Sequence, residues 1–170
     1  MSAIARARAA LALAVAAALA ACAPQAVRRD PDIRIASVMA FDAMRFAGAW
    51  QVVASHTPGC AWADMGWAAR ADGWALSGTE CTGAAPAPLA AEARLVGPGA
   101  RIEAGGAFGG EPVWVLWVDQ DYRVAVLGTP SGHWAMIVAR PGAARADLIA
   151  AARDVLAFNG YDLAQLAAAP

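Results

Sequence analysis

The chain has 170 residues, enough for one domain with a single core, and 59% of them are apolar. Its 13 basic and 14 acidic residues nearly cancel, and no basic run is longer than Arg28-Arg29, which argues against nucleic acid as a partner. Seven tryptophans are more than the alanine-rich composition explains, so we expect several of them to line an interior.

Residues 1–21 are typical of an export signal and not of the fold. Arg6 and Arg8 form a basic start, and an apolar run follows from Ala9 to Ala21. This run is too short for a membrane span, which needs about 20 apolar residues. We therefore predict a signal peptide over residues 1–21, a tether over 22–40 and a folded domain over 41–166.

The apolar run ends in Leu19-Ala20-Ala21-Cys22, which resembles the bacterial lipobox. The resemblance implies that Cys22 is lipidated, becomes the new N-terminus and anchors the protein to a membrane. Ala23 is not the aspartate associated with inner-membrane retention, so the expected location is the outer membrane. The alternative is an ordinary cleavage site with an incidental cysteine.

With Cys22 assigned to the anchor, Cys60 and Cys81 are the two remaining cysteines. An even number in an oxidising compartment predicts a disulfide between them. The alternative is a reactive thiol at one of the two positions.

Short apolar runs punctuated by glycine, proline, aspartate and serine predict many strands joined by turns. A sheet of eight sequential antiparallel strands can close on itself, and we predict an all-β, eight-stranded up-and-down barrel. The fourth and fifth strands have the weakest pattern. The eight predicted strands cover about residues 50–55, 62–69, 74–80, 91–96, 101–104, 113–118, 122–127 and 133–140.

One helix is predicted after the strands, at about residues 143–158. Its apolar side chains share one face, and the pair Asn159-Gly160 is suited to ending it. We expect this C-terminal helix to pack on the outside of the barrel. The expected packing face carries Leu148, Ala151, Ala152 and Val155.

In an up-and-down barrel, odd strands begin and even strands end at the same rim. Trp50 begins the first predicted strand, residues 119–122 turn between the sixth and seventh, and Arg140 ends the eighth. The topology therefore brings these three segments together at one rim. Cys60 and Cys81 fall at the opposite rim, so the predicted disulfide is compatible with the barrel.

These segments resemble the motifs of the lipocalin family, in particular its bacterial outer-membrane lipoprotein branch. Gly48-Ala49-Trp50 matches the Gly-x-Trp motif, and Asp119-x-Asp121-Tyr122 matches the second motif. Arg140-Pro141 matches the third. The similarity covers about residues 41–166, except for a short alanine- and glycine-rich stretch between Cys81 and Pro112.

A barrel that holds an apolar ligand needs a closed floor, and Trp50 is suited to filling it. We predict that the guanidinium of Arg140 lies over the Trp50 ring and that its donors bind the incoming chain. Trp50 as a ligand contact is the alternative to this structural role.

Alternation along the strands predicts which side chains line the interior. For the sixth strand two inward sets stay open, Trp114 with Leu116 or Val115 with Trp117, and each tryptophan has floor or helix packing as its alternative. The predicted ligand contacts are Val52, Ala54, Met65, Trp67, Trp74, Leu76, Trp117, Trp134 and Met136.

The predicted function is binding of one small hydrophobic ligand for storage or transport at the cell envelope, with fatty acids or lysophospholipids implied by the lipocalin resemblance. Four side chains near the open rim are candidates for a head group, or are ordinary solvated loop residues: His56, His133, Glu80 and Glu111. The alternative function is a lipid-tethered interaction or inhibitor module whose barrel is filled by its own side chains.

Little in the sequence supports catalysis, a cofactor or a metal. Ser55 and His56 are neighbours and point to opposite faces of a strand, so they are not expected to act as a nucleophile and base. Two histidines without a nearby cysteine cluster do not predict a metal site. The glycine-rich segment 105–110 lacks the context of a phosphate loop and predicts a flexible loop at the barrel mouth.

Overall fold

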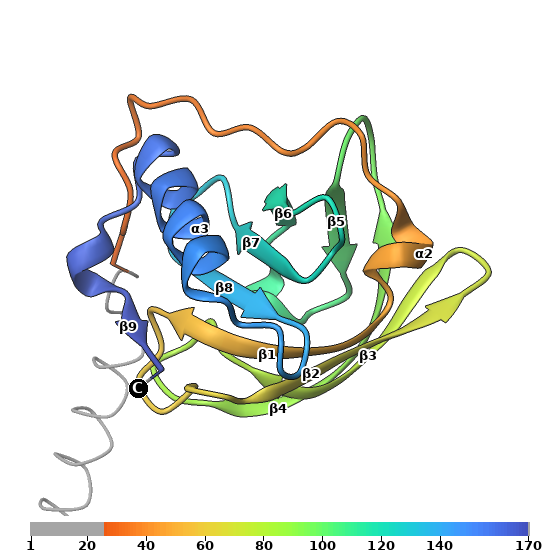
Figure 1. The fold of residues 1–170 in the computed structure, drawn as a ribbon. Coiled ribbons are helices and arrows are strands. Elements are labelled where there is room, and N and C mark those ends of the chain that lie inside the picture. The colour runs from red at the N-terminus through yellow and green to blue at the C-terminus, as the bar shows by residue number, and fades with distance from the viewer. Residues whose placement is uncertain (1–25, 170) are drawn as a thin grey trace, which may run out of the picture.

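The computed structural model describes residues 26–169, so the predicted signal peptide (1–21) and Cys22 lie outside the described residues. The eight antiparallel strands form a closed barrel, because β1 pairs with β8 on one side and with β2 on the other (Figure 1). This confirms the predicted up-and-down barrel. Its strands are β1 (Gly48–Ser55), β2 (Asp64–Arg70), β3 (Gly73–Glu80), β4 (Ala87–Leu95), β5 (Arg101–Ala104), β6 (Val113–Val118), β7 (Val124–Gly128) and β8 (Ala135–Ala139).

Strands β4 and β5, which had the weakest sequence pattern, are both present. β4 begins four residues earlier than predicted and pairs with β3 from Ala87 to Ala93. β5 has the predicted bounds, but it pairs with β6 through only two residue pairs, Arg101 with Trp114 and Ile102 with Val113. Among neighbouring strands of the barrel, β5 and β6 therefore have the shortest pairing.

Glycines allow the wall to bend where β3 approaches its neighbours most closely. Gly73 has φ of 148°, and a Cβ atom there would lie 2.0 Å from the carbonyl oxygen of Ala93 on β4. Gly78 has φ of 104°, and a Cβ atom there would lie 2.3 Å from the carbonyl oxygen of Asp64 on β2. Both positions exclude a side chain sterically as well as conformationally.

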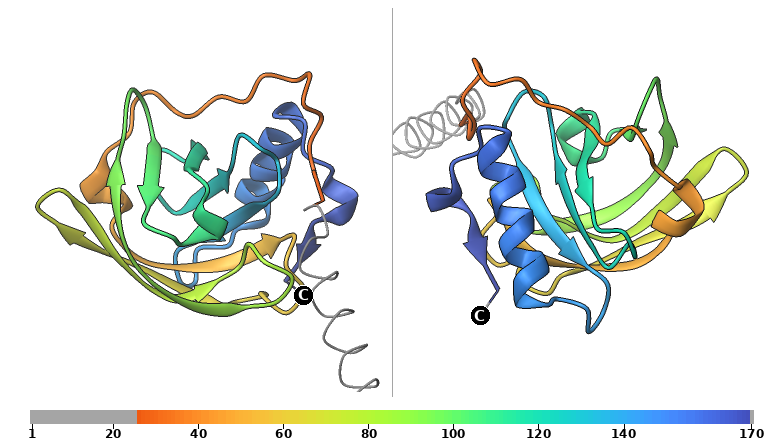
Figure 2. Two further views of the ribbon diagram at one scale, coloured as in Figure 1. Left: turned by 180° about the vertical axis from the view of Figure 1, so that it is seen from behind. Right: turned by 45° about the horizontal axis from the view of Figure 1, so that its top comes forward.

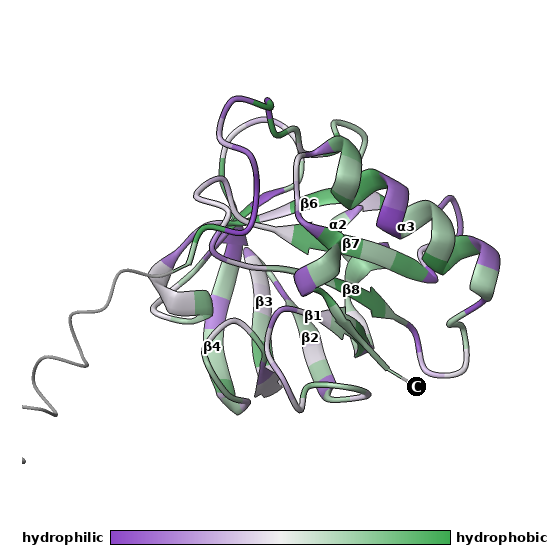
Figure 3. Ribbon diagram, turned by 90° about the vertical axis from the view of Figure 1, so that its left-hand side faces the viewer, coloured by the Kyte–Doolittle hydropathy of each residue, from purple (hydrophilic) through white to green (hydrophobic). Residues whose placement is uncertain are grey.

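The predicted helix is α3 (Ala146–Phe158), and it packs on the outside of β6, β7 and β8. Figure 3 shows hydrophobic colour along β7 and β8, which have a core on each face. Val124, Val126 and Ile137 face the helix, while alternate residues of the same strands face the barrel interior. On α3 the fully buried residues are Ala152 and Leu156, so the packing face is centred slightly later than predicted.

Two small elements flank the ends of β1. The short helix α2 (Ala43–Phe46) precedes β1, and Asp42 caps it by accepting hydrogen bonds from the backbone of Met44 and Arg45. Strand β9 (Ala167–Ala168) lies beyond the predicted domain end and pairs with the last residues of β1.

The segment predicted as a tether is docked on the barrel from its first described residues. Figure 2 shows it passing α3 and crossing the barrel to α2. The backbone N–H of Arg28 donates to the carbonyl oxygen of Gly132 in the β7–β8 loop, 2.8 Å away. Farther along, Val38 donates to Val115 and accepts from Ala100. This described part of the segment is therefore an arm of the folded domain.

Candidate ligand-binding interior

The closed end of the barrel is built around Trp50 and Arg140, as the motifs predicted. The guanidinium carbon of Arg140 lies 3.9 Å from the centroid of the Trp50 ring. Its nitrogens donate to backbone oxygens of α2 and the adjoining residues, including Arg45 at 2.7 Å and Ala47 at 2.9 Å. Burial lowers the pKa of Arg140 from its ordinary value. The floor is thus a clamp between the end of β8, the helix α2 and the start of β1.

The second motif forms the turn between β6 and β7 at the same rim. Asp119 accepts hydrogen bonds from the backbone of Arg123 and Val124 and from the Arg123 side chain. Partial burial opposes ionisation of Asp119, but these hydrogen bonds keep its pKa below the ordinary value. Tyr122 has φ of 58°, and its hydroxyl accepts from the backbone of Asp42 at 2.7 Å. Asp121 is exposed and pairs with Arg123. These residues have structural roles.

Aromatic rings are in contact from this floor to the opposite, open rim. Phe46 lies 4.9 Å from Trp50 and 5.1 Å from Trp67, measured between ring centroids. Trp67 lies 5.5 Å from Trp74 and 6.2 Å from Phe108. Phe108 in turn lies 5.7 Å from Trp134 near the mouth. We call these six rings the aromatic column.

Most of the predicted ligand contacts lie in the interior. Their side chains belong to one buried cluster with the aromatic column, and each is at most 4% exposed. Several small side chains on other strands face the same space, Ala93, Ala104 and Ala125 among them. The predicted contacts found in the interior cluster are Val52, Met65, Trp67, Trp74, Leu76, Trp134 and Met136.

Two predicted contacts, Ala54 and Trp117, lie outside the barrel instead. The pairing of β1 with β8 shifts by one residue between Val52 and Ala54, and Ala54 then packs in the core beneath α3. A similar shift between Val115 and Trp117 turns Trp117 toward that outer core. Both shifts are β-bulges, which reverse the inside-outside alternation beyond them. The inward residues of β6 are therefore Val113 and Val115.

The open rim is held by the predicted disulfide and by two carboxylates. Cys60 and Cys81 are bonded, with their Cα atoms 6.0 Å apart. Glu80 accepts a hydrogen bond from the backbone of Gly109, 3.2 Å away. Glu111 accepts from the hydroxyl of Thr129 at 2.6 Å and also contacts Ser131 and His133.

Burial opposes ionisation of Glu111, but its hydrogen bonds with Ser131, Thr129 and His133 hold its pKa below the ordinary value. His56 is buried, and its Nδ1 accepts from the backbone of Ala135 at 3.1 Å. Burial, with the nearby charge of Arg28, lowers the pKa of His56. His56 is therefore neutral at pH 7 and is not a solvated loop residue.

Phe108 is one of several interior residues that sequence reasoning missed, and it is the one that comes from the loop between β5 and β6. It lies in the segment Gly105–Gly110, here called the mouth loop, which joins β5 to β6. The side chain of Phe108 is fully buried between Trp67 and Trp134 although it comes from a loop. The single aromatic residue within a glycine-rich loop was the available signal.

The four interior tryptophans differ in their hydrogen bonding. At the floor, Trp50 donates to the carbonyl oxygen of Phe46 at 2.9 Å, and Trp74 donates to that of Ala43 at 3.2 Å. No described residue accepts a hydrogen bond from the buried indole nitrogen of Trp67 or of Trp134. Because a buried N–H without an acceptor is unfavourable, these two positions are open to a polar atom of another molecule.

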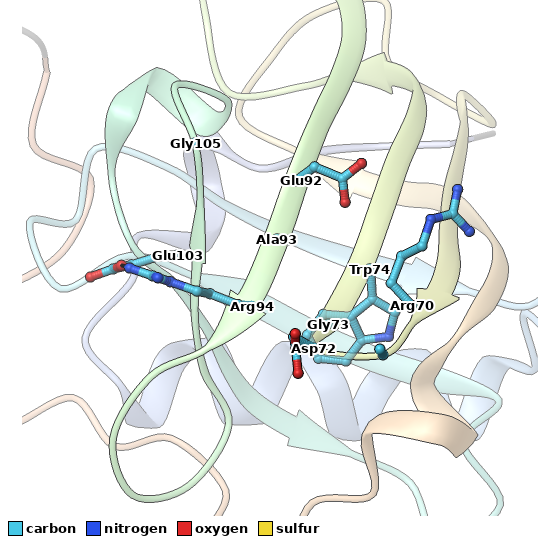
Figure 4. Close-up of a pocket in the computed structure, with 10 residues that line it drawn as sticks. Arg70, Asp72, Gly73, Trp74, Glu92, Ala93, Arg94, Glu103 and Gly105 are labelled. Carbon is cyan, nitrogen blue, oxygen red and sulfur yellow. Dashed lines mark hydrogen bonds and ion pairs between the residues drawn. The ribbon is translucent and has the colours of Figure 1, made fainter.

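A separate trough of about 650 Å³ lies on the outer face of β2–β5. Its charged side chains alternate with Trp74 and Ala93, which face the interior. Figure 4 shows Arg94 beside Glu103, with Arg70 across the strands from them. The trough is thus a surface feature bordered by charged side chains and is separate from the buried interior cluster.

Ser55 and His56 do not form a catalytic pair. The hydroxyl of Ser55 is bonded to the backbone of Thr57, and His56 is bonded to Ala135. Within residues 26–169, no three His, Cys, Asp or Glu side chains are grouped as a metal site would require. In the same part of the chain, no helix is both long and apolar enough to cross a membrane.

No protein-family model matches the chain, and neither does any curated protein sequence. Solved structures do match. Lobster apocrustacyanin A1 has a TM-score of 0.56 at 11% identity, covering 75% of this chain and 78% of that one. Apocrustacyanin C1 has a TM-score of 0.54 at 12% identity, covering 74% and 77%. Apocrustacyanin C2 has a TM-score of 0.53 at 11% identity, covering 83% and 92%.

At these identities the likeness concerns the fold and not the ligand or the role of the protein. Crustacyanins are lipocalins, and the shared features are the closed eight-stranded antiparallel barrel and the helix that follows it. The chain thus has the lipocalin fold.

Proposed function

We propose that this protein binds one small hydrophobic molecule inside its barrel. The observation that carries the proposal is the continuous cluster of apolar side chains inside the closed barrel, from Trp50 at the floor to Trp134 at the mouth. A ligand that buries about 12 methylenes would gain roughly 10 kcal/mol before ordering and association costs, which are large enough to remove half of it. Micromolar affinity is therefore within reach of a lipid chain.

We further propose that the protein acts at the cell envelope, as a member of the bacterial outer-membrane lipoprotein branch of the lipocalins. Lipidation of Cys22 would supply the anchor. The docked arm supports this role, because Arg28 is bonded to Gly132 in the β7–β8 loop at the open rim. The six steps from Cys22 to Arg28 span at most about 22 Å, so an anchor would keep the mouth close to the membrane. Fatty acids and lysophospholipids are then the expected ligands.

A titration of the delipidated, oxidised protein with a lysophospholipid and a fatty-acid series tests the proposal. Both ligands stay below their micelle concentrations, and tryptophan fluorescence is the readout. We expect a saturable change at one equivalent that strengthens with chain length. No response to any chain length would overturn ligand binding.

The second candidate is an interaction or inhibitor module with a self-filled barrel. The aromatic column favours it, since the rings of Trp67, Trp74 and Phe108 already contact one another along the interior. For this candidate we expect no lipid response and a protein partner that binds the outer surface. The same titration therefore separates the two functions.

A further inference from the structure

We propose that Phe108 is a movable plug and that the site it fills takes an uncharged apolar molecule with one hydrogen-bond acceptor, such as a ketone, ester or alcohol. This inference rests on the proposed function, because it takes the barrel interior as the ligand site. It adds how the ligand enters and which polar group its buried end carries.

The position of Phe108 is the first argument. Its ring is fully buried and lies nearly parallel to that of Trp67, with an angle of 18° between the ring planes. Yet Phe108 comes from the mouth loop, and its backbone φ of 56° is a value that residues other than glycine rarely adopt. Its ring can therefore leave the interior with the loop, without disturbing a strand.

Glycines on both sides of Phe108 give the loop the freedom to move. Gly106, Gly109 and Gly110 all have positive φ values, of 84°, 69° and 75°. A Cβ atom at any of the three would meet no other atom within 4 Å, so the described neighbours do not wedge the backbone in place. Rotation at these residues can lift the ring of Phe108 away from the barrel axis.

The wall beside the mouth loop also has an opening. The pairing of β5 with β6 ends at Ile102 and Val113, and the strands separate above this level. A pocket of about 300 Å³ lies there, lined by residues 103–106 and 110–112. A displaced loop therefore has space next to it.

The indole nitrogens define the polar group of the ligand. Trp67 and Trp134 flank Phe108, and they are the two interior tryptophans whose N–H groups have no acceptor among the described residues. A ligand that replaces the Phe108 ring brings its own atoms beside these two indoles, and an acceptor oxygen on its buried end would satisfy an indole N–H that it reaches from the edge of the ring. An ionised carboxylate is disfavoured at this buried position, because the surrounding cluster is apolar and offers it no cation. A fatty acid would therefore enter tail first, keep its carboxylate at the open rim and leave the indole N–H groups without an acceptor.

The carboxylate of Glu80 holds the mouth loop in its closed position, and that of Glu111 ties the residue after the loop to the β7–β8 loop. Glu80 accepts a hydrogen bond from the backbone of Gly109, and Glu111 binds the β7–β8 loop through Thr129. The Glu80 bond is long at 3.2 Å and lies at the exposed rim, so it can be exchanged for water. Removing this latch should ease opening without altering the interior.

The test compares the oxidised wild type with F108A, E80A and F158A by calorimetry and by NMR of the indole N–H groups. Phe158 is the control, because its ring is 80% exposed on α3, outside the barrel, and belongs to neither buried cluster. The probes are methyl hexyl ketone, its isostere with a methylene group in place of the carbonyl oxygen, and octanoate. W67F and W134F assign the two indole signals.

We expect the ketone to shift the indole N–H signals of Trp67 and Trp134 and to bind about tenfold or more tighter than the methylene isostere and octanoate. F108A should tighten ketone binding about tenfold, because the competing ring is gone, and F158A should match the wild type. E80A should speed association of the ketone. The E80A variant also tests the movable plug if F108A fails to fold.

Three outcomes would overturn the inference. If the ketone and its isostere bind equally and the indole N–H signals do not move, the claim that the site selects a hydrogen-bond acceptor is wrong. If F108A leaves the ketone affinity unchanged and E80A leaves the association rate unchanged, the claim that Phe108 is a movable plug is wrong. In either case a lipid response in the wild type leaves the proposed function intact. If wild type and F108A bind no probe and no lipid, the proposed function fails together with the inference.

Discussion

The guanidinium of Arg140 covers the ring of Trp50 at 3.9 Å and at the same time donates hydrogen bonds to Ala49, at 3.0 Å, and to Tyr122, at 3.2 Å. One side chain thus joins three segments of the chain and seals one end of the barrel. A planar fork of five donors is required for this, and the ammonium of a lysine cannot reproduce it.

Replacing Arg140 by lysine should lower the free energy of unfolding by about 2 to 4 kcal/mol, because several carbonyl oxygens, three of them in part-buried bonds, lose their donors and Trp50 loses the planar guanidinium stacked on its ring. Urea denaturation measures the change. Arg94→Lys is the control, since Arg94 forms only an exposed pair with Glu103, and it should stay within about 0.5 kcal/mol of the wild type. Equal effects of the two variants would contradict the clamp.

Replacing both Cys60 and Cys81 by serine should lower the free energy of unfolding by about 3 kcal/mol, because the bond closes a loop with a sequence separation of 21. The folded barrel should persist, since the floor and the helix core lie elsewhere. Thermal unfolding with and without reductant checks this. Reductant should lower the Tm of the wild type and leave that of the double variant unchanged.

Leu156→Ala should cost about 2 to 5 kcal/mol, because Leu156 is fully buried between α3 and the barrel wall. Phe158→Ala, two residues further along the same helix, should be nearly neutral because Phe158 is exposed. Chemical denaturation of the two variants side by side measures the difference. A large loss in F158A would mean that α3 packs with a different face.

The stability of the protein should fall as the pH rises from about 10 to 12. Burial raises the pKa of Tyr161 to about 12, and its hydroxyl donates to the carbonyl oxygen of Thr129 at 2.8 Å. The unfolded chain releases this proton near pH 10, so the folded state loses its advantage between the two values. Tyr161→Phe should flatten this alkaline loss in a series of urea denaturations. A slope unchanged by the substitution would assign the effect to another group.

The barrel was predictable because its signals are local and repeated. Turn residues punctuate short apolar runs, and the order of strands then fixes which ends share a rim. This order alone brings Trp50 and Arg140 together. The disulfide between Cys60 and Cys81 was predictable because these two cysteines remain once Cys22 is assigned to the anchor and because the expected compartment is oxidising. These inferences need only the period of a strand and the alternation of direction.

The predictions that were wrong or missing concern features that depend on tertiary structure. Ala54 and Trp117 were predicted to face inward, and one-residue bulges sent both outward. Phe108 escaped prediction because alternation applies to strands, whereas this ring enters the interior from a loop. The docking of Arg28 on Gly132 joins residues that are distant in sequence, and no periodic pattern marks such a contact.

The small strand β9 has a consequence for how copies of this protein behave toward each other. The pairing of β1 with β2 extends only to Gln51, and beyond it Ala54 and Ser55 pair with β9, while Ala169 donates to the carbonyl oxygen of Val53 at 2.7 Å. Without β9, this stretch of β1 would be a bare strand edge able to recruit a strand from a second molecule. By covering this edge, the alanines of β9 should disfavour strand exchange between copies of the protein and the growth of fibres.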